Sequence, residues 1–373
     1  MKKIIVSVTN DLSGDQRVDR VCRTLTEMGF QVLLVGRGLP ESQPLAERPY
    51  ATHRMRLIFR KGPLFYGEFN KRLLLFLVFR HFDLLLANDL DTLTANRLAG
   101  WLRRKPVVYD SHEYFTEVPE LVGRPRIQSF WRWLEKHLVP GVAAACTVSP
   151  PIAAIYTRLY GIPFAVVRNL PFFRKPETEE HVVPDGNPGL PLIIYQGALN
   201  KGRGVEKAIL AMDLLPEAQL AIAGSGDLEE ELQLLAAGLH LKNVRFTGKL
   251  PPEKLWDLTR QASLGISLEE DLGLSYRYAL PNKLFDYIQA RIPVVVSGLP
   301  EMGRIVKDYD IGMVVSSHDP ETLAAAFRKA LTHDTLRKKW ALNLEKAAAE
   351  LNWDKEKEIL MRIFAPFVNP SIL

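Results

Sequence analysis

Short apolar runs alternate with amphipathic stretches along both halves of the chain. The first half has predicted strands at 3–8, 31–36, 83–87, 106–110, 143–148 and 164–168, and predicted helices at 15–29, 66–80, 90–103, 126–138 and 150–159. The second half has predicted strands at 192–196, 219–223, 243–246, 263–267, 293–297 and 311–315, and predicted helices at 204–214, 227–238, 252–261, 282–290 and 319–334. This alternation is typical of α/β domains built on doubly wound parallel sheets.

A stretch without apolar periodicity separates the two halves. A chain of 373 residues exceeds the size at which a single core usually divides. Residues 171–191 carry five prolines and two glycines, which is typical of a linker. The sequence therefore predicts Rossmann-like domains over 1–170 and 192–353 that face each other across a cleft. The last segment, 354–373, is expected to cross back as a helix over 354–367 and to pack on the first domain.

The composition is that of an ordinary globular protein, with 47% hydrophobic and 24% charged residues. Cys22 and Cys146 lack metal-site spacing and lie in apolar stretches, which predicts buried thiols in a reducing compartment. The first apolar run ends at Asn10, too early for a secretory signal, and the run 73–79 is too short to span a bilayer. These features predict a cytoplasmic protein.

Charge is distributed unevenly between the halves. Residues 1–168 hold 24 Lys and Arg against 15 Asp and Glu, a net charge of +9, and residues 169–373 hold 24 against 28, a net charge of −4. The asymmetry predicts an acidic partner for the first domain, either a phosphate-bearing acceptor or an anionic membrane surface. Nucleic acid is not expected, because no aromatic-interleaved basic motif is present. Segment 71–80, basic at both ends, fits either a membrane-surface helix or a core helix.

Glycine-rich loops follow two predicted strands of the second domain, at the edge where parallel sheets bind ligands. Gly197 begins a loop that leads to Arg203 and Lys207, two basic residues that can face a diphosphate at a helix start. Gly224 and Gly226 form a second loop, although the third glycine of a dinucleotide fingerprint is absent.

The segment 281–297 carries the most specific pattern. Pro281 suits the start of a helix, whose first N–H groups are then available for phosphate oxygens. Those groups belong to Asn282, Lys283 and Leu284. Asp286 lies one turn further along, where its carboxylate can accept hydrogen bonds from two ribose hydroxyls, and a purely structural role is the alternative.

In the first domain, His112 follows the predicted strand 106–110 between two acids, Asp110 and Glu113. A histidine in this position can contact a reacting sugar, although lone histidines are often structural. Glu113 is assigned to the acceptor side of the same loop.

Two further loops of the first domain are candidates for acceptor contacts. Asp89 and Asp91 form an Asp-x-Asp triplet, but no third ligand accompanies it, so helix capping and shaping of an acceptor loop are favoured over a metal site. Asp15 and Arg17 follow the first strand, where they can hold an acceptor or cap the next helix.

These loops together resemble the retaining glycosyltransferases of family 4, the group 1 enzymes with the GT-B fold. The strongest element is 281–287, which runs into 293–297. The other matching segments, in the order of that family, are 88–91, 110–113, 147–149 with 167–169, 197–204 and 224–226. The resemblance covers nearly the whole chain.

The resemblance implies a nucleotide-sugar-dependent transferase that retains configuration and needs neither a metal ion nor another cofactor. Arg203 would neutralise the diphosphate, Asp286 would hold the ribose, and His112 would contact the transferred sugar near the reacting carbon. The remaining donor contacts would come from the backbone of Lys283 and Leu284 and from a base pocket at Lys249 and Leu250.

Two positions depart from the family pattern. Tyr278 stands where relatives often have a glutamate that contacts the donor sugar, with Glu269 or Glu270 as the candidate substitute. Ala198 replaces a basic residue common after the first glycine, which leaves more of the phosphate contacts to Arg203 and Lys207.

The leading hypothesis is a hexosyltransferase that acts on a glycan or lipid-linked acceptor in surface polysaccharide biosynthesis, on the inner face of a membrane. A nucleotide-sugar 2-epimerase of the same fold is the alternative enzyme, and it would need no acceptor. A catalytically degenerate partner subunit is the non-enzymatic alternative, because the donor-sugar glutamate is absent.

Overall fold

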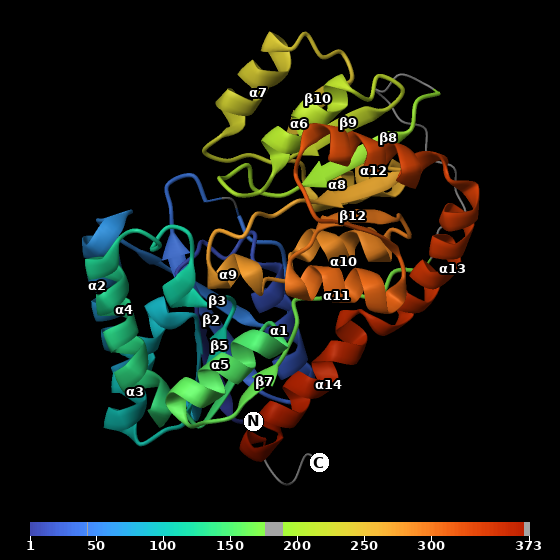
Figure 1. Ribbon diagram of the computed structural model, residues 1–373. Coiled ribbons are helices and arrows are strands. Elements are labelled where there is room, and N and C mark those ends of the chain that lie inside the picture. The colour runs from blue at the N-terminus through green and yellow to red at the C-terminus, as the bar shows by residue number, and fades with distance from the viewer. Residues whose placement is uncertain (43, 176–188, 369–373) are drawn as a thin grey trace. The chain divides into compact units, whose positions relative to one another are not determined.

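The computed structural model describes residues 1–42, 44–175 and 189–368. The chain divides into two compact units: unit 1 contains Met1–Asn169 and the residues from Lys355 onward, and unit 2 contains Leu170–Asp354. Most of the predicted linker, 176–188, lies outside the described residues. Each unit is a parallel sheet with helices on both faces, as the alternating pattern predicts (Figure 1).

Among its described residues, unit 1 has a seven-stranded parallel sheet in the order β3-β2-β1-β4-β5-β6-β7. The strands are β1 (Lys3–Ser7), β2 (Gln31–Gly38), β3 (Ala51–Arg56), β4 (Leu84–Asn88), β5 (Val107–Ser111), β6 (Ala144–Thr147) and β7 (Phe164–Val166). β1 pairs with both β2 and β4, so the strand order reverses direction beside it. Open α/β sheets bind ligands outside the carboxyl ends of the strands at such a point.

The helices of unit 1 connect these strands. They are α1 (Gln16–Glu27), α2 (Gly62–Val78), α3 (Leu90–Arg103), α4 (Pro125–Leu138) and α5 (Pro150–Tyr160), with short 3-10 turns at Phe115–Glu117, Val139–Gly141 and Ala365–Phe367. The last helix, α14 (Trp353–Phe364), also packs on unit 1. Its Glu356 pairs with Arg168 at 2.6 Å, and Phe364 contacts Phe30 edge to face.

Strand β3 is absent from the predicted strands, because its sequence Ala-Thr-His-Arg-Met-Arg is mostly polar and only Met55 is buried. This composition suits the edge of a sheet. Helix α2 contains the segment 71–80 up to Val78, and it buries Phe65, Phe69, Leu73 and Leu77, one residue per turn. Within the segment 71–80, Leu73 and Leu77 therefore pack in the core, as expected of a core helix.

Unit 2 has a six-stranded parallel sheet among its described residues, in the order β10-β9-β8-β11-β12-β13. The strands are β8 (Leu192–Gln196), β9 (Gln219–Ala223), β10 (Val244–Gly248), β11 (Leu264–Ser267), β12 (Val294–Ser297) and β13 (Gly312–Val315). The helices are α6 (Val205–Asp213), α7 (Glu229–Gly238), α8 (Pro252–Gln261), α9 (Leu274–Arg277), α10 (Asn282–Gln289), α11 (Pro300–Tyr309), α12 (Pro320–Thr332) and α13 (Asp334–Glu350). The sequence patterns did not predict α9 and α11.

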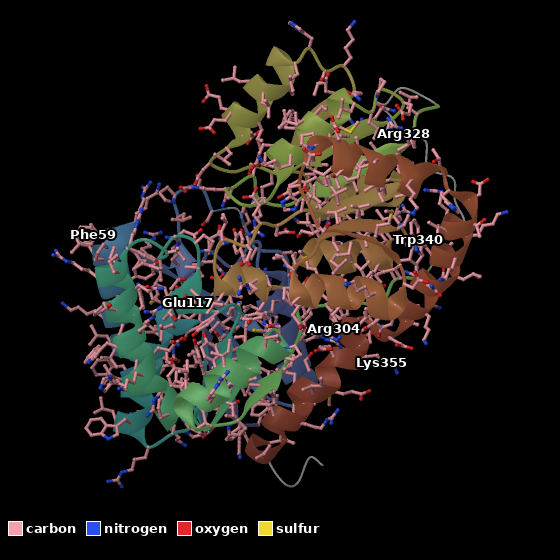
Figure 2. The ribbon with its side chains drawn as sticks, in the orientation of Figure 1. Phe59, Glu117, Arg304, Arg328, Trp340 and Lys355 are labelled. Carbon is pink, nitrogen blue, oxygen red and sulfur yellow. The ribbon has the colours of Figure 1, made fainter. Side chains whose placement is uncertain are left out.

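Two hydrophobic cores hold the sheet of unit 2 between its helices. Val295 of β12 belongs to the core formed with α6 and α12, whereas Val294 and Val296 belong to the core formed with α10, α11 and α13. Successive strand residues point to opposite faces, which explains the continuously apolar strands. Trp340 of α13, labelled in Figure 2, is buried in the first of these cores.

Two further predictions concern cysteines and membrane spans. Cys22 and Cys146 are buried and not disulfide-bonded, as predicted. In the part of the chain that the structure describes, no helix combines the length and the apolar character needed to cross a membrane.

Candidate functional site

A buried ion pair lies at the carboxyl edge of the unit 1 sheet. Asp110, near the end of β5, accepts hydrogen bonds from Arg17 Nη2 at 2.7 Å and from Arg17 Nε at 3.1 Å. Arg17 also donates to the Val167 carbonyl oxygen at 2.8 Å and is only 2% exposed. Arg17 therefore holds Asp110 in place, and this geometry favours a positioning role over the acceptor contact expected from the sequence.

His112 stands next to this pair with an acceptor facing each ring nitrogen. Nδ1 lies 3.4 Å from Asp89 Oδ2, and Nε2 lies 3.3 Å from Asp110 Oδ2 and 3.1 Å from Asn88 Oδ1. The Asn88 amide donates from Nδ2 to the Ser7 carbonyl oxygen, which leaves its Oδ1 to accept from the imidazole. Both ring nitrogens are thus placed to donate, which favours the doubly protonated ring.

The pKa values of this cluster follow from its charges. Burial alone would lower the pKa of His112, but the carboxylates of Asp89 and Asp110 outweigh it and raise this pKa to about 9. Burial opposes ionisation of Asp110 as well, yet the charges of Arg17 and His112 hold its pKa well below the ordinary range. At neutral pH the cluster therefore contains an imidazolium and an ionised Asp110.

Asp89 and Asp91 do not cap helix α3 in the way the sequence predicts. Asp89 occupies the position before the helix with a φ of 58°, yet its side chain makes no capping bond. Its Oδ1 instead accepts from the His112 backbone N–H at 2.8 Å. Asp91 is buried and accepts from Thr9 Oγ1 at 2.6 Å, and burial together with the charge of Asp89 raises its pKa to about 7. The triplet shapes the loop around His112.

The other two residues assigned to the acceptor side lie at the rim of this cluster. Asp15 caps α1 by accepting from the Val18 N–H at 3.0 Å, and its second oxygen accepts from Asn10 Nδ2 at 2.7 Å. The capping alternative therefore describes Asp15. Glu113 is exposed, and its carbonyl oxygen accepts from the Ser111 hydroxyl at 2.7 Å.

In unit 2, two cations share one buried carboxylate. Lys283 Nζ lies 2.9 Å and Arg203 Nη1 lies 3.6 Å from Glu269 Oε1. Lys283 Nζ also stands 4.0 Å above the Tyr195 ring, and Ser267 Oγ donates to the other Glu269 oxygen at 2.6 Å. Burial opposes ionisation of Glu269, but Lys283, the Ser267 hydrogen bond and Arg203 together lower its pKa. Two positive charges therefore surround one negative charge at the carboxyl ends of β8 and β11.

Glu269 had no definite predicted role and was offered only beside Glu270 as a substitute for a missing acid. The strand period of two distinguishes Glu269 from Glu270. Glu269 lies two residues after Ser267, the last residue of β11, so both side chains point the same way, and both are buried. Gln196 was also missed, and it orients Asp286. It donates from Nε2 to Asp286 Oδ2 at 2.8 Å and accepts from Thr259 Oγ1 at 2.7 Å.

The glycines of the two donor loops have a packing role. A Cβ atom on Gly224 would lie 1.8 Å from the Gly197 carbonyl oxygen, and one on Gly226 would lie 2.6 Å from the Leu199 backbone. Gly197 itself has a φ of 135° and flanks Lys283, whose Nζ would stand 3.5 Å from a Cβ there. The Gly-x-Gly pattern thus lets two backbone segments touch, and only Gly197 adjoins a candidate ligand-binding group.

Helix α10 begins at Asn282, as predicted, but one expected donor is already engaged. The Leu284 N–H donates to the Pro281 carbonyl oxygen at 3.1 Å, so it is not unpaired as expected, and its contact with a donor phosphate stays a prediction. Asn282 is exposed. The remaining donor-side residues lie elsewhere in unit 2: Lys207 is half-buried in α6, Lys249 is exposed and Leu250 is half-buried before α8.

Acidic and histidine side chains do not gather into a metal site in the described part of the chain. Within 1–42, 44–175 and 189–368, no group of three or more His, Cys, Asp or Glu residues is arranged to hold an ion. Metal independence stays a prediction.

Family comparisons match each half of the chain separately. The model of the family described as glycosyl transferases group 1 matches residues 177–347. The model described as glycosyltransferase family 4 matches residues 15–171.

Individual relatives are more distant. The chain is 27% identical over 161 residues to phosphatidyl-myo-inositol mannosyltransferase of Mycobacterium leprae, covering 41% of this chain and 39% of the relative. It is 24% identical over 255 residues to alpha-D-kanosaminyltransferase of Streptomyces kanamyceticus, covering 64% of each protein. The alignments thus span less than two thirds of these relatives.

Solved structures share the fold over the whole chain. Sucrose-phosphate synthase from Thermosynechococcus elongatus superposes with a TM-score of 0.76 at 17% identity, covering 98% of this chain and 99% of that structure. The Anabaena protein HepE in complex with UDP-glucose superposes with a TM-score of 0.72 at 12% identity, covering 98% of this chain and all of that structure.

Proposed function

Because this chain belongs to the group 1 glycosyltransferases with the GT-B fold, we propose that it transfers a sugar from a nucleotide-diphosphate sugar to an acceptor, with retention of configuration. The observation that carries the proposal is the pair of family matches, one over most of each unit. The 2-epimerase alternative is not favoured, since both family descriptions name glycosyl transfer.

The donor diphosphate is assigned to the two cations that share Glu269 in unit 2. A diphosphate is a dianion or more, and charge-assisted hydrogen bonds from Lys283 and Arg203 suit it. Glu269 keeps both side chains near one point. The bound UDP-glucose in the HepE structure supports this class of donor.

The nucleoside end of the donor is assigned to neighbouring positions. Asp286, held by Gln196, accepts hydrogen bonds from the ribose hydroxyls in this proposal. Lys249 and Leu250 line the base pocket, as the family resemblance implies. In this proposal Lys283 and Arg203 stabilise the negative charge that develops on the departing diphosphate, so the reaction needs no metal ion.

The proposed reaction exchanges one bond at the anomeric carbon. The bond from this carbon to the diphosphate oxygen breaks, the acceptor oxygen bonds to the same face, and the acceptor proton passes to the departing phosphate. His112 contacts the transferred sugar, and because its two ring N–H groups face Asp89, Asp110 and Asn88, a sugar oxygen that accepts from the ring replaces one of these acceptors. With a pKa of about 9, His112 is protonated at neutral pH, so it does not serve as the base.

The acceptor is proposed to be a glycan or a lipid-linked glycan in surface polysaccharide assembly, with unit 1 on the inner face of a membrane. Support comes from the net charge of +9 over residues 1–168 and from exposed aromatic residues. Phe79 is 84% and Trp101 is 75% exposed near the ends of α2 and α3, which Arg103 links by donating to the Val78 carbonyl oxygen. Such rings suit a membrane interface.

Calorimetry with UDP-, GDP- and ADP-sugars tests the donor assignment. Arg203→Ala and Asp286→Ala should abolish binding of the nucleotide-sugar that the wild type binds. Lys338→Ala, an exposed change on α13, serves as the control and should bind normally. Unchanged binding in both site variants would refute the assignment, and NMR of the product's anomeric configuration tests retention.

Transfer by the purified chain separates an enzyme from a degenerate partner subunit. Product formed from donor and acceptor by the chain alone would exclude the partner-subunit alternative. Co-sedimentation with anionic vesicles at low salt tests the membrane assignment, and Phe79→Ser/Trp101→Ser should weaken it.

A further inference from the structure

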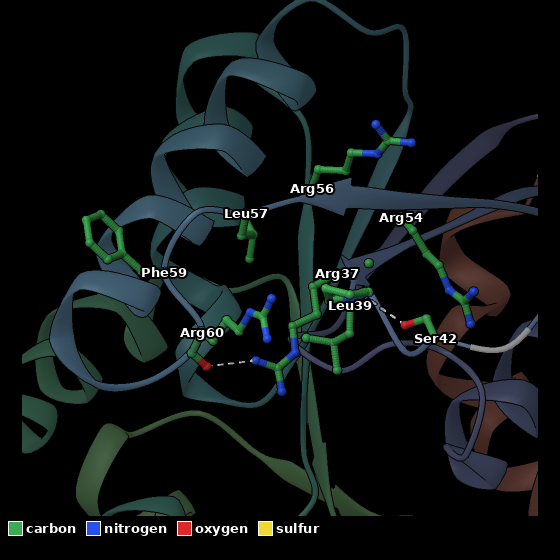
Figure 3. A pocket seen from close by; sticks show the side chains of 10 residues that line it. Arg37, Leu39, Ser42, Arg54, Arg56, Leu57, Phe59 and Arg60 are labelled. Atoms are coloured by element: carbon green, nitrogen blue, oxygen red, sulfur yellow. Dashed lines mark hydrogen bonds between the residues drawn. The ribbon is translucent and has the colours of Figure 1, made fainter.

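A basic pocket lies in unit 1 at the carboxyl ends of β2 and β3. It has a volume of about 570 Å³, and its ten lining residues include four arginines and no acid. The arginines are Arg37, Arg54, Arg56 and Arg60. Figure 3 shows them approaching from β2, β3 and the connection that follows β3. None of these residues belongs to the His112 cluster or to the donor site of unit 2.

The pocket has preformed walls. Arg37 donates from Nη1 to the Arg60 carbonyl oxygen at 3.2 Å, and its guanidinium stands 4.7 Å from the centre of the Phe65 ring. Glu68 accepts from the N–H groups of Ile58 and Phe59 at 2.9 Å, which fixes the connection that carries Arg60. Arginines held in this way need little further ordering to bind a ligand.

The positive charge of the pocket is only partly compensated: the Asp11 carboxylate accepts from the pocket-lining Ser42 Oγ at 3.1 Å, and the charge of Arg54 helps to lower the pKa of Asp11. Within the described ranges, Arg37, Arg56 and Arg60 form no ion pair, and the buried Nε of Arg37 has no hydrogen-bond acceptor. The nearby Glu68 side chain pairs with Arg72 at 2.8 Å. Like charges gathered in one pocket repel each other, and a bound anion would remove this cost. Guanidinium groups match phosphate oxygens with paired hydrogen bonds.

Exposed apolar side chains lie close in sequence to the pocket residues. Phe59, which lines the pocket, is 42% exposed, and Ile58 and Leu64, within four residues of Arg60, are 75% and 62% exposed. Figure 2 shows Phe59 at the outer edge of unit 1 beside α2. A cationic pocket with exposed apolar side chains nearby fits a molecule that carries a phosphate next to a hydrocarbon chain.

We propose that this pocket binds a phosphate group of the acceptor molecule, held by Arg37, Arg54, Arg56 and Arg60. The inference rests on the proposed function, since it gives the acceptor of that transfer a chemical class. The exposed Ile58, Phe59 and Leu64 favour a lipid as the carrier of the phosphate over a soluble sugar phosphate.

The test uses the full chain and the double variant Arg56→Gln/Arg60→Gln, because both arginines are exposed and their loss should not unfold unit 1. The control is Arg126→Gln/Arg158→Gln, two exposed arginines of the same unit that lie outside the pocket. Binding of pyrophosphate is measured by calorimetry with the donor site saturated by the nucleoside diphosphate. The pocket variant should bind at least about tenfold more weakly, since the loss of even one charged hydrogen bond costs about that factor. The control should match the wild type.

A second arm identifies the carrier of the phosphate. Co-sedimentation is compared for vesicles of phosphatidylcholine with and without phosphatidic acid. A lipid carrier predicts that phosphatidic acid recruits the wild type and the control but not the pocket variant. If the pocket variant loses affinity for pyrophosphate but still co-sediments with phosphatidic acid vesicles, the phosphate site is supported and its ligand is a soluble phosphate compound.

Equal pyrophosphate and vesicle binding by the pocket variant and the control would overturn the inference. Arg37→Gln provides a second, independent variant of the same pocket and should also weaken both. Failure of the proposed function would give a different result: no nucleotide-sugar would bind to unit 2, whereas the pocket variants would still bind pyrophosphate more weakly than the wild type. The two failures are therefore distinguishable.

Discussion

The polar clusters of the two units have different charge balances. In unit 1, the two carboxylates of Asp89 and Asp110 face one arginine and one histidine, and the strongest contact is the buried pair of Arg17 and Asp110. In unit 2, two cations surround the single carboxylate of Glu269. Both clusters lie at the carboxyl edges of sheets with similar strand order, so the topology alone does not determine their chemistry.

The difference indicates which part of a nucleotide-sugar each cluster suits. A surplus of positive charge suits the anionic diphosphate, and this surplus is in unit 2. The carboxylates of unit 1 suit hydroxyl groups and keep His112 protonated. The comparison therefore predicts that variants of the two clusters affect different properties of the protein.

The largest effect is expected from Arg17→Met, which leaves Asp110 ionised and buried without its main partner. Breaking such a pair costs about 3–5 kcal/mol, so the melting temperature of unit 1 should fall by about 6–20 °C. Arg17→Met/Asp110→Asn should recover much of the loss, because no unpaired carboxylate remains. Calorimetry checks both variants, and a loss below about 1 kcal/mol in the single variant would contradict this account.

Lys283→Met should lower the affinity for the nucleoside diphosphate by about 10- to 150-fold, the value of one charged hydrogen bond. His112→Gln should leave that affinity unchanged, because the unit 1 cluster is not assigned to the diphosphate. Titration calorimetry measures both variants. An equal loss in His112→Gln would mean that the two clusters are not divided between diphosphate and sugar.

The next prediction concerns pH. His112 should titrate with a pKa of about 9 by NMR, and Asp89→Asn should move this pKa toward 6.5 by about one unit or more. Since the folded pKa lies above the unfolded one, the stability contributed by charged His112 is complete below about pH 6.5 and is lost as the pH rises through 9. A His112 pKa near 6.5 would contradict the cluster's charge balance.

The smallest effect is expected at the donor loop's second basic residue. Lys207 makes no hydrogen bond or ion pair within the described residues, so Lys207→Ala should change nucleotide affinity by less than about fivefold, the range of an exposed ion pair. The remaining effect should disappear in high salt. A loss as large as that of Lys283→Met would show that the diphosphate lies closer to α6 than proposed.

The strand–helix order was predictable because buried parallel strands are continuously apolar, as in β4 and β8. The edge strand β3 was not, because its polar residues lack that pattern. Helix α11 was missed although it is as long as the predicted α8, because Gly298, Pro300 and Gly303 are turn-type residues at its start.

The candidate sites were predictable only in part. Their loops could be placed, because residues after parallel strands meet at one edge of the sheet. The roles of particular residues depended on contacts between distant segments. Arg17 was predicted to hold an acceptor or cap a helix, because its pairing with Asp110, 93 residues away, has no signal in the local sequence. Gly224 was predicted to let the backbone approach a ligand, and the close carbonyl oxygen of Gly197 adds a packing requirement for glycine that the sequence does not reveal.

Hydrogen exchange in the presence and absence of the bound nucleoside diphosphate tests the central claim most directly. We predict slower exchange in unit 2 at residues 197–207 and 280–290, which carry Arg203 and Lys283, and no comparable change at 88–91 and 110–113 in unit 1. Protection confined to the unit 1 segments would contradict the assignment of the diphosphate to the cation pair of unit 2.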